Sequence, residues 1–213
     1  MKRIGAHKNL ARGRAERGNT LIEFALVTIF LVPMFLGTVN IGMSLSRSIQ
    51  TSQISRDAGH MYARYVDFSE AQNQEIIVRL ASGMRMGRTS GQGKVVLSRV
   101  MYVGTLECAS GGFEEHECPN FGRPVITQQI IVGDAAKRES KLGEPPANLF
   151  NSKGEMSPDD YLVRSDAQAA GFDNILAMQP GELAYVSEAY FESPELDFPG
   201  FLENTSNYAR TIF

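Results

Sequence analysis

The stretch that decides the fold is Gly18-Asn19-Thr20-Leu21-Ile22-Glu23-Phe24-Ala25-Leu26-Val27, with the apolar run that continues from it to Leu45. From Phe24 to Leu45 the chain has 22 residues without a charge, and twelve of them are Leu, Ile, Val or Phe. As a helix these residues span roughly 33 Å, which covers a hydrocarbon core of about 30 Å. The twelve side chains favour insertion by roughly 4 to 7 kcal/mol. The run therefore predicts a transmembrane helix over residues 24–45.

The run is too long to be a cleaved secretory signal. The apolar part of a signal peptide has about 7 to 15 residues and ends at a small-residue cleavage site. No Ala-x-Ala closes this run, so we expect it to remain in the protein as a single membrane anchor. Pro33 removes one backbone donor and is expected to kink the helix.

The residues before the run are basic. Residues 1–18 carry six Lys or Arg and one acid, Glu16, which gives them a net charge of +5. Because the whole chain has a net charge of −3, the remaining residues have a net charge of −8. Positive residues beside a first membrane helix stay in the cytoplasm, which places the acidic bulk outside. With its glycines and no apolar stripe, this leader is expected to be disordered. A basic tail also suits nucleic acid, but a membrane helix follows at once, and no nucleic-acid partner is expected.

Glu23 is the one acidic residue at the start of the apolar run, directly before Phe24 and five residues beyond Gly18. A basic leader, Gly, four residues, Glu-Phe and a long apolar helix resemble the prepilin-type leader of type IV and Flp/Tad pilins. The sequence from Arg17 to Val27 most resembles that of the TadE/TadG-type pilus assembly proteins, the minor pseudopilins of Tad systems. Glu-Phe, where the major Flp pilin has Glu-Tyr, favours the minor component. The resemblance is close over residues 17–45 and loose elsewhere.

The resemblance implies how these residues work. A prepilin peptidase would cut between Gly18 and Asn19, and Glu23 and Phe24 would serve recognition and assembly. The implied partners are that peptidase, other pilin-like subunits, Tad assembly-platform proteins and the membrane. The protein would sit in the inner membrane with a cytoplasmic N-terminus and a periplasmic head, or enter the pilus. Thr20-x-x-Glu23 also has the spacing of a helix capping box, which is compatible with that role.

Beyond Leu45 the apolar residues keep a helical period, which predicts one continuous helix of about 45 residues from near Thr20. A second helix is expected over 70–82, opened by a capping box at Ser69 and ended at Gly83. Alternating apolar residues predict strands over 94–108, 124–132 and 182–192, the first two antiparallel, and a short strand over 208–213. Ser157-Pro158 marks a plausible helix start.

These elements predict an α+β fold: a long N-terminal helix packed on a small antiparallel sheet, the pilin-like architecture that the resemblance also implies. The expected organisation is a leader over 1–18, the long helix over 19–66 and an extracytoplasmic head over 67–213.

Cys108 and Cys118 are the only cysteines. In an outward-facing domain a disulfide is the default. Zinc is the alternative, because His116 and the acids Glu114, Glu115 and Glu117 lie nearby, although the spacing lacks the paired cysteines of structural zinc sites. Free thiols are a third possibility.

No motif supports catalysis. The three histidines, His7, His60 and His116, are scattered, and neither a Gly-x-Ser-x-Gly elbow nor a phosphate loop occurs. Asp159-Asp160 suits the start of a helix better than a pair of catalytic acids. We therefore expect a structural protein without enzymatic activity, cofactor or metal. The alternatives are an uncleaved bitopic membrane protein with a partner-binding outer domain, and a membrane-tethered envelope enzyme.

Overall fold

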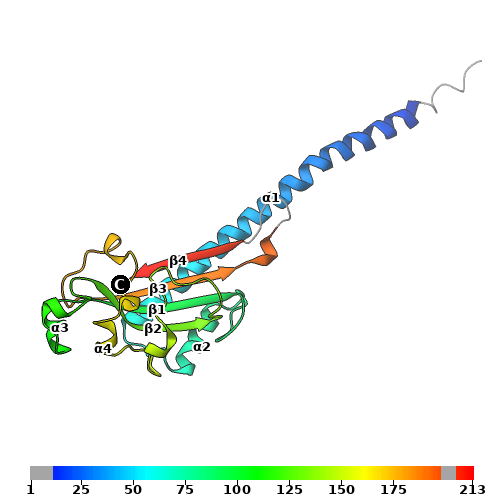
Figure 1. Ribbon diagram of the computed structural model, residues 1–213. Coiled ribbons are helices and arrows are strands. Elements are labelled where there is room, and N and C mark those ends of the chain that lie inside the picture. Colours follow the sequence, from blue (N-terminus) through cyan, green and yellow to red (C-terminus); the bar gives the residue numbers. More distant parts are fainter. Residues whose placement is uncertain (1–11, 198–204) are drawn as a thin grey trace, which may run out of the picture. The chain divides into compact units, whose positions relative to one another are not determined.

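The computed structural model describes the backbone of residues 12–197 and 205–213 and, Glu195 apart, the side chains from Thr20 onward within these ranges. The chain divides into two units, one ending at Leu45 and the other running from Ser46 to Phe213. Helix α1 (Arg12–Ala63) contributes to both (Figure 1). The division falls at the end of the predicted apolar run.

Helix α1 begins at Arg12, earlier than the expected start near Thr20. Residues 12–18, expected to be disordered, are helical, while residues 1–11 lie outside the described residues. Arg, Ala and Glu are strong helix formers and outweigh the two glycines of this segment. Thr20 and Glu23 consequently lie inside the helix, so the prediction that they cap its start is wrong. Pro33 also lies within α1, which continues through it.

At its other end α1 finishes in a Schellman motif. The Tyr65 amide donates to the Tyr62 carbonyl at 3.0 Å, and the Val66 amide donates to the Met61 carbonyl at 3.1 Å. Tyr65 occupies the position where glycine is usual and has φ 65°. An L-residue in this left-handed conformation costs about 1–2 kcal/mol.

Helix α2 (Ala71–Leu80) lies within the predicted 70–82. The predicted capping box is wrong, because the N-cap makes no side-chain hydrogen bond. The Ser69 hydroxyl instead donates to Asp67 Oδ1 at 2.6 Å, and the Asn73 side-chain amide donates to the Asp67 carbonyl at 2.7 Å. These bonds order the connection between the two helices.

The head is built on a four-stranded antiparallel sheet of order β2-β1-β3-β4 (Figure 1). The strands are β1 (Gly93–Tyr102), β2 (Pro124–Gly133), β3 (Leu183–Glu192) and β4 (Ser206–Ile212). The α+β class, the three main strands, the terminal strand and the antiparallel pairing of β1 with β2 are thereby confirmed.

The strand predicted over 94–108 ends early, at Tyr102. Helix α3 (Thr105–Ser110) follows, and the Gly104 amide donates to Glu107 Oε2 at 2.9 Å at its start. The one-turn helix α4 (Pro158–Tyr161) confirms the start expected at Ser157, whose hydroxyl accepts from the Asp160 amide at 3.3 Å. Single 3₁₀ turns lie at Glu115–Glu117, Ala147–Leu149, Ser165–Ala167, Phe172–Asn174 and Pro194–Leu196.

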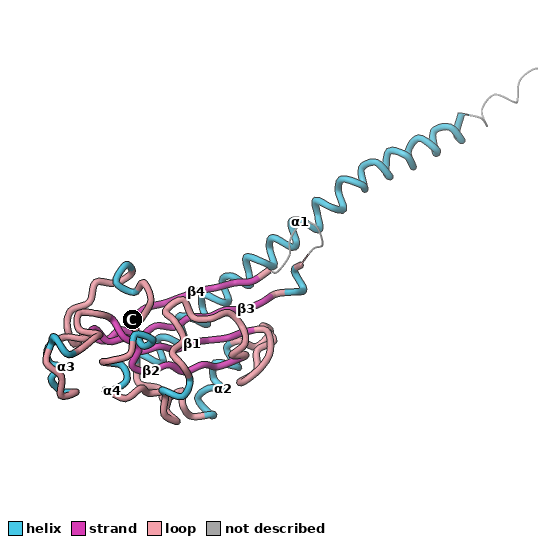
Figure 2. Tube along the Cα trace, viewed as in Figure 1, coloured by secondary structure: helices cyan, strands magenta, loops and turns pink. Residues whose placement is uncertain are grey.

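Each face of the sheet is covered by a different layer. Residues 46–63 of α1, with α2, cover one face, where Ile54, Ala58 and Tyr62 pack against β1, β2 and β3 side chains. The segment between β2 and β3, mostly loop (Figure 2), covers the other face through Leu142, Ala169 and Phe172. Two layers around a sheet give this small head its core.

Glycine permits the close approach of α1 to the sheet. A Cβ added at Gly59 would lie 2.6 Å from the Phe213 ring and 2.9 Å from Ser187 Cβ on β3. Beside it the Ser55 hydroxyl donates to the Ser187 carbonyl at 2.9 Å. Small residues therefore seat the helix on β3 and on the end of the chain.

A buried ionic cluster fixes the loop layer to the sheet. Lys94 on β1 is 1% exposed, and its Nζ donates to Glu144 at 2.5 Å. Glu188 on β3 is also buried and accepts from the Lys141 amide at 3.1 Å and the Tyr208 hydroxyl at 2.5 Å. Because each buried charge has hydrogen-bonded partners, its desolvation is compensated.

Candidate functional site

The apolar segment of α1, residues 20–45, is the first candidate region. Phe24 and Phe30 are 71% exposed and Met34 is 72% exposed. Among the described residues, α1 is the one helix long and apolar enough to cross a membrane. Fully burying one such side chain is worth about 1.5–3 kcal/mol. The segment is therefore suited to apolar surroundings.

Two threonine hydroxyl groups of this segment are satisfied within the helix. Thr28 donates to the Phe24 carbonyl at 2.7 Å, and Thr38 donates to the Phe35 carbonyl at 2.8 Å. A polar group without a partner is costly in hydrocarbon, where water cannot replace the missing bond. These bonds make both threonines compatible with an apolar environment.

The predicted processing and assembly residues follow one another on α1. Gly18 and Asn19 are helical, although their side chains lie outside the described ones. Glu23 and Phe24 lie about one turn further along and are exposed. Residues four apart share a helix face, so Asn19 and Glu23 lie on the same face. Cleavage and assembly themselves stay predictions.

The predicted Cys108–Cys118 disulfide is confirmed, with Cα atoms 6.0 Å apart. It joins α3 to the end of the following 3₁₀ turn and packs with Val103, Val125 and Leu162. The zinc and free-thiol alternatives are wrong, because both sulfur atoms are in the bond. His116 is exposed, and the described residues contain no cluster suited to a metal. A disulfide and one helix of membrane-spanning length suggest a membrane-anchored extracytoplasmic domain.

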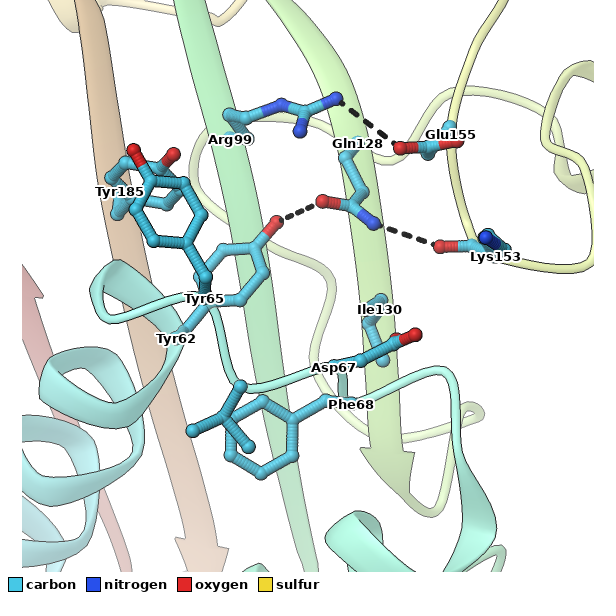
Figure 3. A pocket seen from close by; sticks show the side chains of 11 residues that line it. Tyr62, Tyr65, Asp67, Phe68, Arg99, Gln128, Ile130, Lys153, Glu155 and Tyr185 are labelled. Carbon is cyan, nitrogen blue, oxygen red and sulfur yellow. Dashed lines mark hydrogen bonds and ion pairs between the residues drawn. The ribbon is translucent and has the colours of Figure 1, made fainter.

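A second candidate region is a cavity of about 170 Å³ in the head (Figure 3). Its aromatic walls are Tyr62 from α1, Tyr65 just after it and Tyr185 from β3. Its charged groups are Asp67, Arg99 from β1, and Lys153 and Glu155 from the loop before α4. Gln128 of β2, Ile130, Val66 and Phe68 complete the lining. All of these residues belong to the unit that begins at Ser46.

Hydrogen bonds hold one wall of the cavity in place (Figure 3). The Tyr62 hydroxyl donates to Gln128 Oε1 at 2.9 Å, and Gln128 Nε2 donates to the Lys153 carbonyl at 2.9 Å. Arg99 Nη2 lies 3.7 Å from Glu155 Oε1, an ion pair longer than a hydrogen bond. The wall is fixed while the guanidinium stays partly exposed to the cavity.

A β-bulge aims the polar residues into the cavity. Arg99 pairs with Gln128 but Val100 pairs with Ile126, so Thr127 is the extra residue of β2. Arg99 Nε donates to the Thr127 hydroxyl at 3.0 Å. A bulge bends its strand and redirects side chains, and bulges are frequent beside functional sites.

The tyrosine rings meet edge to face. Tyr62 and Tyr185 have ring centroids 5.3 Å apart, and Tyr65 and Tyr185 have centroids 6.1 Å apart. Burial raises the pKa values of Tyr62 and Tyr185, so both hydroxyls remain neutral donors at physiological pH. Hydrogen bonds from the Ser69 hydroxyl and amide lower the pKa of Asp67, which stays ionised. The lining thus offers aromatic faces, neutral hydroxyls and fixed charges.

The sequence predictions missed this cavity. The helical period beyond Leu45 includes Tyr62 and Tyr65 and predicts only that they pack against the head. The usable signal was Arg99, a charge in the alternating row of β1 that also holds Val95 and Leu97. His60, by contrast, lies outside the lining and packs against the Phe213 ring, 5.8 Å between centroids.

A long N-terminal apolar helix that packs on a four-stranded antiparallel sheet is a pilin-like architecture. Comparison of the chain with protein-family models gave no match, and comparisons with curated proteins and with solved structures gave none either.

Proposed function

We propose that the chain is a structural pseudopilin, a minor component in the assembly of a Tad-type (Flp, type IVc) pilus, and has no enzymatic activity. The observation that carries the proposal is helix α1, whose residues 20–45 expose apolar side chains while residues 46–63 are built into a folded head. Such a helix suits a lipid bilayer before assembly and a bundle of similar helices after it. Its proposed partners are a prepilin peptidase, other pilin-like subunits and Tad assembly-platform proteins.

The charge distribution supports the orientation. Basic residues before Gly18 would keep the N-terminus in the cytoplasm, and the acidic head with its disulfide would lie in the periplasm. The inner membrane would hold the subunit by residues 24–45 until it joins a filament.

The proposed cleavage after Gly18 is consistent with a locally weak helix. The bond lies in a helical segment that contains Gly13 and Gly18, and each interior glycine weakens a helix by about 1 kcal/mol. A peptidase could therefore unwind this segment at low cost. The cut would leave Asn19, a residue type preferred at helix starts, as the new terminus.

Glu23 would serve assembly in this account. The new amine of Asn19 and the Glu23 carboxylate would both enter apolar surroundings in a bundle, and an unpaired charge there costs several kcal/mol. Pairing of Glu23 with the amine of a neighbouring subunit, or of its own chain one helical turn away, removes that cost. A pair between neighbours also sets their axial register.

The test separates cleavage from assembly. Gly18→Ile should block trimming, because the peptidase needs a small residue there, whereas Gly13→Ile, the matched control outside the Gly-to-Glu spacing, should be trimmed normally. Glu23→Gln should be inserted and trimmed but give few pili, while Glu16→Gln should give normal pili. Normal piliation by Glu23→Gln, or a defect confined to trimming, would contradict the proposed role.

The cavity favours a second candidate, an uncleaved bitopic protein whose outer domain binds a partner. Trimming distinguishes the two, because only the pseudopilin loses residues 1–18.

A further inference from the structure

The head has a second hollow, of about 450 Å³, beside the tyrosine-lined cavity. Arg99 and Glu155 line both hollows, so their ion pair lies between them. The second hollow is otherwise lined by Leu149, Asn151, Met156, Ser157, Pro158 and Tyr161. The two hollows are together called the recess; three tyrosines line the first hollow, and Tyr161 lines the second.

Tyr65 lines the recess in a strained backbone conformation. It occupies the Schellman position where glycine is the default, with φ 65°. Its side chain is 83% exposed, so the ring buries little surface in the head. Strained residues of this kind concentrate at functional sites. An exposed, strained tyrosine at the rim is better explained by a ligand than by folding.

The charges of the lining identify the chemical class of that ligand. Arg99 and Lys153 are balanced by Asp67 and Glu155, so the cavity has no net charge and does not favour an anion or a cation. Tyrosine rings offer apolar faces, and carboxylate, amide and guanidinium groups offer paired acceptors and donors. A sugar matches this combination, because each ring has an apolar CH face and a rim of hydroxyl groups.

We propose that this recess binds a neutral oligosaccharide, with one sugar ring stacked on the exposed ring of Tyr65, beside the perpendicular ring of Tyr185, and neighbouring hydroxyls bound by Arg99, Gln128 and Glu155. The second hollow extends the site toward Tyr161 and takes the next units of the chain. This binding concerns the head alone and does not depend on how residues 1–45 act.

The test uses the full-length protein in detergent micelles. Since the chain contains no Trp, its fluorescence comes from seven tyrosines, four of which line the two hollows. Maltohexaose, cellohexaose, mannohexaose and N-acetylchitohexaose are titrated separately, with polygalacturonate as the anionic counterpart. At least one neutral hexasaccharide should give a saturable change and should be preferred to polygalacturonate.

The decisive variant is Tyr65→Gly. It removes the stacking ring and relieves the strain, so it should keep or raise the melting temperature while weakening binding about tenfold. Arg85→Gly is the matched control: Arg85 also has a positive φ, 52°, but lies outside the lining of both hollows. It should leave binding unchanged.

Three results would overturn the proposal: no saturable response to any neutral sugar, preference for polygalacturonate, or equal sugar affinity in the wild type and Tyr65→Gly. A lower melting temperature in Tyr65→Gly would show that the ring serves folding and would also overturn it.

Discussion

Residues 20–45 and residues 46–63 belong to one helix but meet opposite environments. In the first segment Ile41 is 68% exposed, and in the second Ile54 is 4% exposed. Both segments carry apolar residues, so composition alone does not separate them. The difference is distribution: the first is apolar all around the helix, and the second confines Ile54, Ala58 and Tyr62 to the face that meets the sheet.

The two segments also differ in what their small residues do. Gly42 has open space around it, whereas Gly59, which has no side chain, leaves room for Ser187 of β3 and for the Phe213 ring. One helix thus combines a segment suited to an apolar solvent with a segment that forms part of the core of a folded domain. The consequences of this difference can be tested by paired substitutions.

The largest difference is expected between Ile54→Ala and Ile41→Ala. Ile54→Ala should lower the free energy of unfolding of the head by about 2–5 kcal/mol, because it opens a cavity in the core. Ile41→Ala should leave that free energy unchanged. Denaturant titrations in detergent, followed by tyrosine fluorescence, give both values. Equal losses would mean that residues 20–45 also stabilise the head.

The next pair is Gly59→Ala and Gly42→Ala. A methyl group at position 59 overlaps Ser187 Cβ and the Phe213 ring, and overpacking costs about 1–3 kcal/mol, against about 1 kcal/mol gained in helix propensity. Gly42→Ala gains the propensity without the overlap. The same titrations should therefore show a less stable head only for Gly59→Ala. A head stabilised by Gly59→Ala would contradict the close approach of α1 to β3.

The smallest expected effect is a change with pH in the free energy of unfolding of the head. Tyrosine in the unfolded chain ionises near pH 10, whereas burial raises the pKa of Tyr62 in the folded head. The stability contributed by neutral Tyr62 is thus complete below about pH 10 and is lost as the pH rises further. Tyr62→Phe should lower stability at pH 7.5 by about 1 kcal/mol, through the lost bond to Gln128, and should reduce the additional loss at pH 10.5. An unchanged alkaline loss would exclude Tyr62 as its source.

Periodic features were predictable from the sequence, and features that depend on distant contacts were not. The apolar run, β2 and β3 each have a pattern of apolar residues that predicts the type of element directly. The end of β1 was missed because a helix start at Gly104, closed by Glu107, follows the strand at once. The start of α2 was misread because Ser69 bonds to Asp67 instead of capping the helix.

The cavity could not be predicted as a whole, because its residues come from α1, three strands and two loops. Nothing in the local pattern around Tyr65 indicates a left-handed residue, since the Schellman motif there lacks its usual glycine. The disulfide was predictable because compartment and cysteine count restrict the choices. Register and strand order, which bring Arg99 beside Gln128 and Tyr185, depend on pairings across the whole head.

The most direct test of the central claim is the intact mass of the protein isolated from its native membrane, in cells with an active prepilin peptidase. The account predicts a chain that begins at Asn19 and weighs two hydrogens less than its reduced form, owing to the Cys108–Cys118 bond. A mass that still includes residues 1–18 would contradict the pseudopilin and leave an uncleaved membrane anchor in its place.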